Sequence, residues 1–509
     1  LFTQKPVNLG SRCTVFMNSS VKQAQKDGAS VEDISAGLSI SIVKNAIYKV
    51  IRAASADDLG RHIVVQGGTF HNDAVLRAFE QELGRDVTRP AIAGIMGAFG
   101  AALAARDLRL ERSAILDAKA LEAFSHTAKP VTCSLCTNHC SLTVNSFDGG
   151  RRFISGNRCS RPLGKEKAEL PDLYRYKYQR LRAMEGRGNG DGSRGRIGIP
   201  FGLNMYENLP FWYDLFTRLN FEVVLSPESS RKLYIKGQRT IPSDTVCYPA
   251  KLLHGHVQAL VELGVDAIFY PCMSYNFNEK ISDNNYNCPV VAYYPELLAA
   301  NMPDLKKTRF LNPYAGLHRP KDYERIGSQW FADTFGVPRR EAASAIRSAY
   351  GAYAQYQEDV RRTAGEYVRE AGERGLPVIV LAGRPYHIDP EINHGINDLI
   401  TSFGFVVVSE DAVACLEDYA PRKVLNQWTF QARMYNAARY VCEQPDMQLV
   451  QLVSFGCGTD AITGDEVRSI LEEGGKLYTQ LKIDDISNLG AVKIRVRSLM
   501  AAMEERARR

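Results

Sequence analysis

The sequence predicts an α/β protein built from more than one domain. Its 509 residues exceed the length at which a single hydrophobic core usually stops growing, so we expect two to four domains. Short hydrophobic runs alternate with amphipathic helical patterns through most of the chain, an order typical of parallel sheets covered on both faces. With 45% hydrophobic and 24% charged residues, the composition is that of a globular protein rather than a disordered or fibrous one.

Charge and hydropathy exclude several classes of protein. The formal net charge is +6, and basic residues gather at the C-terminal EERARR, which a solvated helix end explains, so we expect no nucleic-acid partner. No apolar run approaches the roughly 18 residues that a membrane span needs, so we expect no membrane partner. The N-terminus lacks the pattern of a signal peptide, which favours a cytoplasmic protein. It also begins in mid-pattern without methionine, and we therefore expect a C-terminal fragment of a longer protein.

Helices and strands alternate in the predicted first domain, residues 1–125. Ser30, with Asp33 three positions later, predicts a capped helix start. Residues 62–84 (HIVVQGGTFHNDAVLRAFEQELG) predict a buried strand, a Gly-Gly turn and an amphipathic helix. Residues 93–107 predict a helix rich in small residues, which lets another backbone approach closely. Gly67 and Gly68 would let backbone amides approach a nucleotide, although such a pair is often only a tight turn.

A cysteine-rich segment at residues 126–165 predicts a metal site. NSFDGGRRF, residues 145–153, predicts a hairpin within it. Four cysteines with the spacing C-x2-C-x3-C-x18-C can enclose zinc or hold an iron–sulfur cluster, and four structural thiols at a surface hairpin are the alternative. The metal stays open between zinc and iron. The four predicted ligands are Cys133, Cys136, Cys140 and Cys159.

Two α/β domains are expected after a linker. Residues 184–196 are rich in glycine, arginine and serine without apolar periodicity, and we place the linker at 166–195. Strand and helix patterns then alternate in two Rossmann-like units of similar layout, which suggests an architectural duplication. Within the first unit, PVVAYYP is expected as a strand. The predicted boundaries are 196–315 for the first unit, 316–375 for a helical connector and 376–509 for the second unit.

Three dispersed cysteines predict a second metal site in the α/β units. Cys272 and Cys457 follow predicted buried strands, and ligands of open α/β sheets gather outside the carboxyl ends of strands. Cys247 opens a predicted helix, where the macrodipole favours a thiolate. Each cysteine alone is better explained as a core residue than as a ligand. Their shared placement nevertheless predicts that Cys247, Cys272 and Cys457 meet in a cleft between the two units.

Other reactive side chains receive no assigned role from the sequence. Cys288 precedes the expected strand PVVAYYP and its role stays open, whereas Cys415 and Cys442 are predicted to pack within helices. Arg384, His387 and His394 follow a predicted strand and could bind an anion or carry protons, or form an ordinary loop. No Walker-type phosphate loop, Ser-His-Asp set or paired-carboxylate arrangement is present in the sequence.

The chain resembles a known family over nearly its whole length. Residues 11–38 (SRCTVFMNSSVKQAQKDGASVEDISAGL), 62–84 and GIMGAFGAALAA resemble the C-terminal part of the ATP-dependent activators of 2-hydroxyacyl-CoA dehydratases. That family belongs to the actin, hexokinase and sugar-kinase superfamily. The rest, including IPSDTVCYPAKLLHGHV, PCMSYN, DNNYNCPVVAYYPE and SFGCGTDAITGDEV, is similar to the large acyl-CoA dehydratase activase-related proteins.

The resemblance implies an activator-type ATPase lobe, of actin/hexokinase-like fold, in residues 1–125. It implies a homodimer that holds one 4Fe–4S cluster at its subunit interface and couples hydrolysis of ATP with Mg²⁺ to delivery of a low-potential electron to a CoA-ester dehydratase or related acceptor. Cys13 matches a ligand of that cluster, and Gly67 and Gly68 match residues that contact the nucleotide, as does Asn72. The matching phosphate loops are expected upstream of Leu1, so we expect ATP hydrolysis only from the longer protein.

The resemblance also implies that Cys247, Cys272 and Cys457 ligate an iron–sulfur cluster, as in dehydratase-type subunits. Our leading hypothesis is an iron–sulfur protein of the activase type. A zinc-containing, non-redox scaffold that binds a partner or a CoA thioester is one alternative. A dehydratase-type subunit in its own right is the other.

Overall fold

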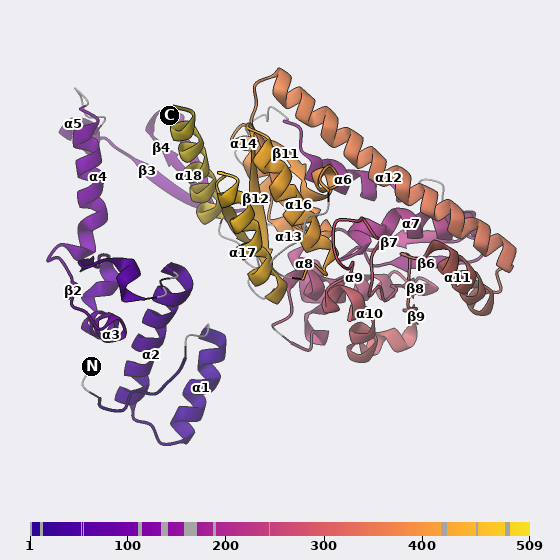
Figure 1. Ribbon diagram of the computed structural model, residues 1–509, viewed down its shortest axis with the longest axis horizontal. Coiled ribbons are helices and arrows are strands. Elements are labelled where there is room, and N and C mark those ends of the chain that lie inside the picture. The colour runs from indigo at the N-terminus through magenta and orange to yellow at the C-terminus, as the bar shows by residue number, and fades with distance from the viewer. Residues whose placement is uncertain are drawn as a thin grey trace. The chain divides into compact units, whose positions relative to one another are not determined.

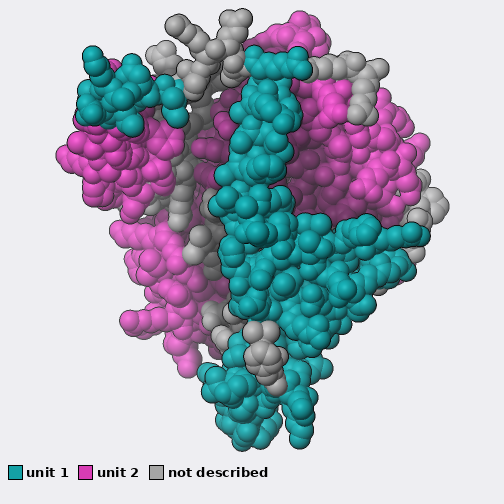
Figure 2. Space-filling view, turned by 90° about the vertical axis from the view of Figure 1, so that its left-hand side faces the viewer, with its two compact units in different colours: residues 1–123 teal, residues 124–509 magenta. Residues whose placement is uncertain are grey.

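The computed structural model shows a mixed α/β protein with parallel sheets, as the sequence predicted. It describes residues 3–10, 14–51, 53, 55–109, 115–133, 141–156, 170–186, 190–243, 245–418, 425–454, 457–483 and 489–508. The chain divides into two compact units, residues 1–123 and 124–509, drawn in different colours in Figure 2. Among the described residues, no helix is long and apolar enough to cross a membrane. The finer domain boundaries predicted from the sequence stay predictions.

The first unit is mainly helical. Its elements are α1 (Thr14–Lys26), α2 (Val31–Asn45), β1 (Ile63–Val64), α3 (Asp73–Leu83), β2 (Val87–Thr88), α4 (Met96–Asp107) and α5 (Ala118–Glu122). The predicted start of α2 is confirmed, because Ser30 and Asp33 form a capping box. β1 pairs with β2 in parallel, but the strand has only two residues and Val64 is 57% exposed, so it is less buried than predicted. α4 is the predicted small-residue helix.

An antiparallel sheet opens the second unit. It consists of β3 (His126–Thr132), β4 (Ser141–Phe147) and β5 (Arg152–Ser155), in that order. The predicted hairpin is confirmed between β4 and β5. Its turn contains Gly149 and Gly150 with φ of +71° and +74°, a backbone region that glycine adopts at little cost.

Two four-stranded parallel sheets follow, and they have the same topology. The first lobe contains β6 (Arg196–Ile199), β7 (Glu222–Leu225), β8 (Ala267–Phe269) and β9 (Arg309–Leu311), in the order β7-β6-β8-β9. The second lobe contains β10 (Val378–Ala382), β11 (Val406–Ser409), β12 (Met447–Ser454) and β13 (Thr479–Ile483), in the order β11-β10-β12-β13. The expected duplication is therefore present in strand order, which is flavodoxin-like rather than that of a dinucleotide-binding Rossmann sheet.

Helices cover both sheets, and one long helix joins them. The first lobe has α7 (Met205–Arg218), α8 (Arg231–Gly237), α9 (Tyr248–Glu262), α10 (Pro289–Asn301) and α11 (Pro320–Phe335). The second lobe has α13 (Pro390–Asn393), α14 (Ile396–Ser402), α15 (Glu410–Ala414), α16 (Thr429–Glu443), α17 (Gly458–Glu473) and α18 (Leu489–Arg508). The 35-residue α12 (Arg339–Glu373) packs against α7 and α11 of the first lobe and against β11 and α15 of the second (Figure 1).

Two segments differ from the sequence predictions. PVVAYYP, expected as a strand, begins α10, because Cys288 caps the helix and Pro289 supplies the fixed φ that suits a first helical position. Its buried residues Val291, Tyr294 and Leu298 lie three and four positions apart, as on a helix face. Within the stretch expected as a linker, α6 (Leu173–Arg182) packs on the second sheet, where the Tyr174 hydroxyl donates to Leu381 O at 2.9 Å.

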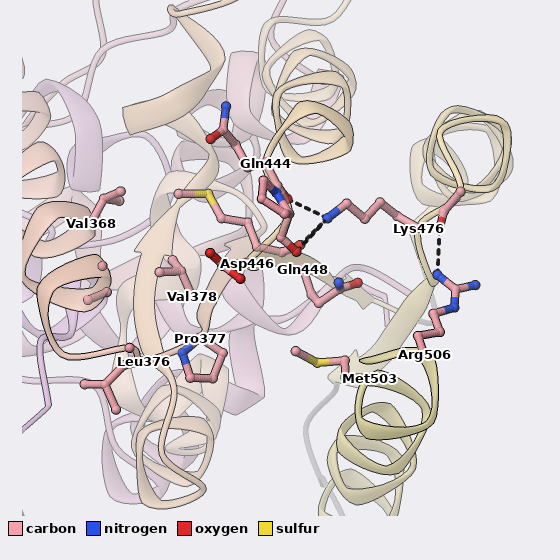
Figure 3. A pocket seen from close by; sticks show the side chains of 16 residues that line it. Val368, Leu376, Pro377, Val378, Gln444, Asp446, Gln448, Lys476, Met503 and Arg506 are labelled. Atoms are coloured by element: carbon pink, nitrogen blue, oxygen red, sulfur yellow. Dashed lines mark hydrogen bonds between the residues drawn. The ribbon is translucent and has the colours of Figure 1, made fainter. Parts of the chain in front are cut away.

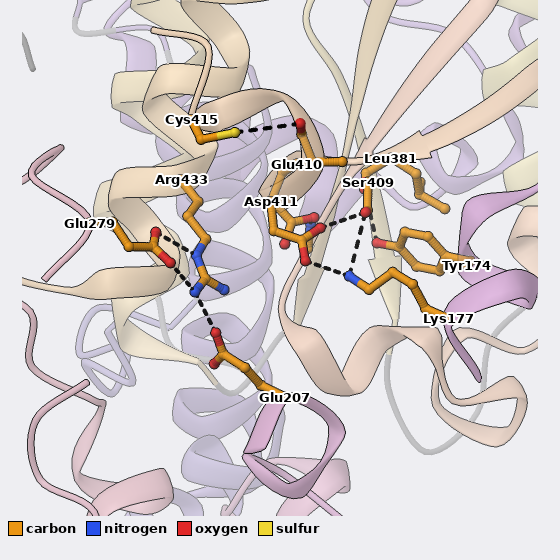
Figure 4. A network of polar contacts seen from close by, with 12 residues as sticks. Tyr174, Lys177, Glu207, Glu279, Leu381, Ser409, Glu410, Asp411, Cys415 and Arg433 are labelled. Atoms are coloured by element: carbon orange, nitrogen blue, oxygen red, sulfur yellow. Dashed lines mark hydrogen bonds and ion pairs between the residues drawn. The ribbon is translucent and has the colours of Figure 1, made fainter. Parts of the chain in front are cut away.

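The two lobes share one hydrophobic core, and buried polar side chains connect them within it. Arg433 on α16 forms ion pairs with Glu207 on α7 and, at 2.6 Å, with Glu279 in the loop after β8 (Figure 4). The Arg433 and Glu207 side chains are each only 3% exposed. Lys177 on α6 pairs with Asp411 on α15 at 2.6 Å. The Arg433 pairs join α16 of the second lobe to α7 and the loop after β8 of the first lobe, whereas the Lys177 pair holds α6 on the second lobe.

Candidate functional site

A cavity of about 400 Å³ lies between the two lobes and contains three cysteines. Cys247 and Cys288 reach it from the first lobe, and Cys457 reaches it from the loop after β12 in the second. Arg384, from the loop after β10, and Trp428 also line it. β10 and β12 are neighbours between which the strand order reverses, the place where open α/β sheets bind ligands.

Each of the three cysteines is the N-cap residue of a helix. Cys247 caps α9, Cys288 caps α10 and Cys457 caps α17. These helices have 15, 13 and 16 residues, and the partial positive charge at the start of each favours an anion or a thiolate. Three N-termini around one cavity therefore favour a negatively charged group within it.

Backbone pairing between the lobes holds Cys288 at this cavity. Tyr286 N donates to Gln427 O at 2.9 Å, and Thr429 N donates to Tyr286 O at 3.2 Å. Cys288 follows Tyr286 by two residues, and Trp428 lies between the two paired residues of the second lobe. The pairing therefore brings Cys288 of the first lobe and Trp428 of the second lobe to the same cavity.

Burial controls the charge of two of the thiols. It raises the pKa of Cys247 to about 12 and also raises the pKa of Cys288. Both side chains are therefore neutral thiols near pH 7 in the protein without metal. Binding of a metal centre replaces those protons, so metal uptake at this site releases protons and becomes more favourable as the pH rises.

A chain of hydroxyl and imidazole groups connects the lobes beside the cavity. Ser226 Oγ accepts from Phe201 N at 2.8 Å and lies 2.7 Å from His256 Nδ1, to which its hydroxyl donates when the neutral ring carries its hydrogen on Nε2. His256 Nε2 lies 3.0 Å from Ser229 Oγ, which in turn donates to buried Asp389 of the second lobe. In this arrangement one ring nitrogen of His256 accepts a hydrogen bond, which is possible only when the imidazole is neutral.

The neutral state of His256 predicts acid lability. Burial lowers the pKa of His256 to about 3, so the folded state disfavours the imidazolium that forms near pH 6.5 in the unfolded chain. The stability that this group contributes is present above pH 6.5 and is lost as the pH falls, by about 1.4 kcal/mol for each pH unit. Urea unfolding at pH 5 and pH 7, followed by tryptophan fluorescence, should show a shallower pH dependence for His256→Gln than for the wild type. Equal dependence in the two proteins would contradict this assignment.

The structure brings together two of the three dispersed cysteines that the sequence singled out. Cys247 and Cys457 line the cavity together with Cys288, whose role the sequence left open. Cys272 is not among the residues that line it. Its backbone pairs with Pro313 O and Ala315 N, each at 2.9 Å, and burial raises its pKa to about 11. The assignment of Cys272 as a ligand stays a prediction.

The described cysteines do not form a site for a single metal ion. In the part of the chain that the structure describes, no three His, Cys, Asp or Glu side chains converge closely enough for one metal ion. Cys247, Cys288 and Cys457 nevertheless line the same cavity.

The remaining predicted metal ligands are mostly outside the described residues. Cys133 is buried, 6% exposed, directly after β3. Cys13, Cys136, Cys140 and Cys159 lie outside the described residues.

The predicted nucleotide contacts lie in an open turn of the first unit. Gly67 has a φ of +103° and donates to Ala93 O at 2.7 Å, and a Cβ on Gly67 or Gly68 would meet no atom within 4 Å. Asn72 Oδ1 accepts from Ala74 N at 2.9 Å and caps α3. The turn is thus accessible to a ligand, while Asn72 already has a structural role.

The two histidines of the loop after β10 make contacts that support the structure around them. His387 Nδ1 accepts from Arg384 N at 3.0 Å, and burial, with Arg384 nearby, lowers the pKa of His387 well below its usual range. His394 has a φ of +55° at the end of α13, and its ring stacks on Tyr248 with 6.4 Å between centroids. His387 is therefore neutral near pH 7 and brings no positive charge to the cavity that it lines.

A larger cavity of about 620 Å³ lies near the amino-terminal ends of β10 and β12 (Figure 3). Lys476 Nζ donates there to Met447 O at 3.0 Å and to Gln444 O at 2.5 Å. Arg506 Nη1 donates to Gly475 O at 2.6 Å. Both cations therefore already donate to backbone carbonyl groups. This makes the cavity a weaker candidate for a functional site than the cysteine-lined one.

Comparisons with known proteins match two regions of the chain. Residues 3–105 match the BadF/BadG/BcrA/BcrD ATPase family. Residues 196–413 match the CoA enzyme activase uncharacterised domain, which includes Cys247 and Cys288 but ends before Cys457.

Two curated relatives each match about a fifth of this chain. The chain is 35% identical over 105 residues to the 2-hydroxyisocaproyl-CoA dehydratase activator of Clostridioides difficile, a match that covers 21% of this chain and 38% of that protein. It is 35% identical over 99 residues to the (R)-2-hydroxyglutaryl-CoA dehydratase activating ATPase of Acidaminococcus fermentans, covering 19% and 36%. The chain thus spans well under half the length of each relative.

A solved structure of the activator of the 2-hydroxyisocaproyl-CoA dehydratase from Clostridium difficile, with bound ADPNP, matches at 31% identity. The match covers 23% of this chain and 43% of that one, with a TM-score of 0.19. The sequence comparisons confirm the predicted resemblance: the chain is similar to the BadF/BadG/BcrA/BcrD ATPase family, to the CoA enzyme activase uncharacterised domain and to two dehydratase activators.

Proposed function

We propose that the chain is part of an iron–sulfur protein of the acyl-CoA dehydratase activase type. In the full-length protein, ATP binding and hydrolysis would be coupled to low-potential electron transfer to a CoA-ester dehydratase or a related acceptor. The observation that carries the redox part is the set of three helix-capping cysteines around one cavity between the lobes. The ATP-dependent part rests on the relatives, which are named as dehydratase activators and as an ATPase.

Cys247, Cys288 and Cys457 would hold a 4Fe–4S cluster in this cavity. When bound, such a group supplies reversible one-electron transfer at a potential set by its surroundings. The three helix N-termini favour the negative charge of the thiolates, and the Trp428 and Tyr386 side chains help to exclude water. In this proposal Cys288 is the third cysteine ligand, where the sequence predicted Cys272.

The first unit would bind ATP with Mg²⁺ through Gly67 and Gly68, with Asn72 beside them. Cys13 would ligate a cluster shared by two copies of the chain in a homodimer. Cys133, Cys136, Cys140 and Cys159 would form a further site for iron or zinc. These assignments rest on the sequence pattern and on similarity to the activators.

Elemental analysis of anaerobically purified protein tests the proposal. We expect iron and acid-labile sulfide, with a visible absorption that dithionite bleaches. A colourless, iron-free protein after anaerobic reconstitution would refute it. Zinc in place of iron, without bleaching, would instead identify the non-redox scaffold, and dehydration of an acyl-CoA in the presence of a separate activator would identify a dehydratase-type subunit.

A further inference from the structure

A buried ion pair lies directly behind Cys457. Arg384 and Asp460 have side chains only 3% and 4% exposed, and the guanidinium contacts both carboxylate oxygens, with Nη1 3.3 Å from Oδ2. Asp460, in the first turn of α17, also accepts from Ser454 N at 2.8 Å. The pair thus fixes the end of β12 to the start of α17, the two points between which Cys457 lies.

The same guanidinium reaches the cysteine sulfur. Arg384 Nη2 lies 3.3 Å from Cys457 Sγ and 3.2 Å from Thr459 Oγ1. One Nη2 hydrogen points to Asp460, so the other is shared between the sulfur and the threonine oxygen. The sulfur therefore accepts a charge-assisted hydrogen bond from a buried cation, and such bonds are stronger than those between neutral groups.

The direction of the Thr459 hydrogen bond follows from its neighbours. Thr459 Oγ1 lies 3.0 Å from Gln431 Nε2 and 3.2 Å from Arg384 Nη2, both of which can only donate. Those two donors occupy the acceptor positions of the hydroxyl. Its own hydrogen is then left for Cys457 Sγ, 3.1 Å away. The sulfur of Cys457 thus accepts two hydrogen bonds, one from Arg384 and one from Thr459.

We propose that Arg384 and Thr459 are positioning residues that donate hydrogen bonds to Cys457 Sγ and raise the reduction potential of the cluster it binds. This inference rests on the proposed function. Reduction adds negative charge that is shared with the ligand sulfurs, so donors aimed at a sulfur stabilise the reduced state more than the oxidised one. By contrast, the backbone donor to Cys288 Sγ, Val291 N, lies farther away at 3.5 Å.

Thr459→Val is the sharpest test, because valine has the shape of threonine without the hydroxyl. Redox titration of the cluster-loaded full chain should give a more negative potential for Thr459→Val than for the wild type. We expect about a tenfold change in the one-electron reduction equilibrium, equivalent to about 59 mV. Thr459→Ser, which keeps the donor, should stay close to the wild type. An unchanged potential in Thr459→Val, in a protein that holds a normal amount of iron, would overturn the inference while leaving the proposed function intact.

The paired variant Arg384→Gln with Asp460→Asn tests the second donor in the same titration of the cluster-loaded full chain. It should also shift the potential to a more negative value, because the sulfur loses the hydrogen bond from the guanidinium. An unchanged potential, in a protein that holds a normal amount of iron, would overturn the role of Arg384. A wild type without iron would instead refute the proposed function.

Discussion

Cys288→Ser is expected to remove most of the iron bound between the two lobes. A 4Fe–4S cluster contributes about four irons per chain, and we expect less than one to remain at this site. Serine is a poor replacement because its hydroxyl stays protonated near neutral pH, whereas a cluster needs an anionic ligand. Iron and acid-labile sulfide, counted after anaerobic reconstitution, measure the loss.

Cys272→Ser and Cys415→Ser are the matched controls for that experiment. Cys272 is the residue that the sequence favoured, and Cys415 is an exposed cysteine away from the cavity. Both variants should keep the iron of the wild type. Loss of iron in Cys272→Ser together with full retention in Cys288→Ser would show that the cavity is not the binding site.

Arg433→Met is expected to destabilise the second unit by about 3–5 kcal/mol. The substitution removes the cation that pairs with Glu207 and Glu279. Glu207 is then left as a buried carboxylate whose partners among the described residues are neutral, Asn276 Nδ2 at 3.2 Å and the Tyr353 hydroxyl at 3.4 Å. The three tryptophans of the chain, Trp212, Trp330 and Trp428, all lie in this unit, so urea unfolding followed by their fluorescence measures the loss.

Two further variants separate burial from charge. Arg218→Met breaks an exposed pair with Asp214 and should cost less than about 1 kcal/mol. Adding Glu207→Gln to Arg433→Met removes the stranded charge and should recover part of the lost stability. A loss for Arg433→Met no larger than that for Arg218→Met would contradict the role of the buried network.

Much of the fold could be predicted because its signals are local. The capping box of Ser30 and Asp33 and the Asp-Gly-Gly turn of the hairpin each specify their backbone within a few residues. The start of α10 could not be predicted in the same way. A proline followed by a short apolar run suits both a strand edge and a first helical turn, and only packing of the Val291 and Tyr294 face decides between them.

The site was predicted less completely for the same reason. The positions of Cys247 and Cys457 at element ends predict their place in the site, whereas the sequence leaves the role of Cys288, before an expected strand, open. The signal that could have found it is the proline shared by Cys247-Tyr-Pro and Cys288-Pro, which marks a helix start. The partners of Arg384 could not be predicted, because Asp460 is 76 residues away in sequence and only the strand order brings it close.

The most direct test of the central claim uses the full chain with Cys13, Cys133, Cys136, Cys140 and Cys159 all replaced by serine. Only the cysteines of the α/β lobes then remain to bind iron. After anaerobic reconstitution and dithionite reduction, electron paramagnetic resonance should show a reduced cluster, with about four irons per chain, that disappears when Cys457 is also replaced. An iron-free protein without a signal would contradict the claim that the three helix-capping cysteines hold a redox cluster.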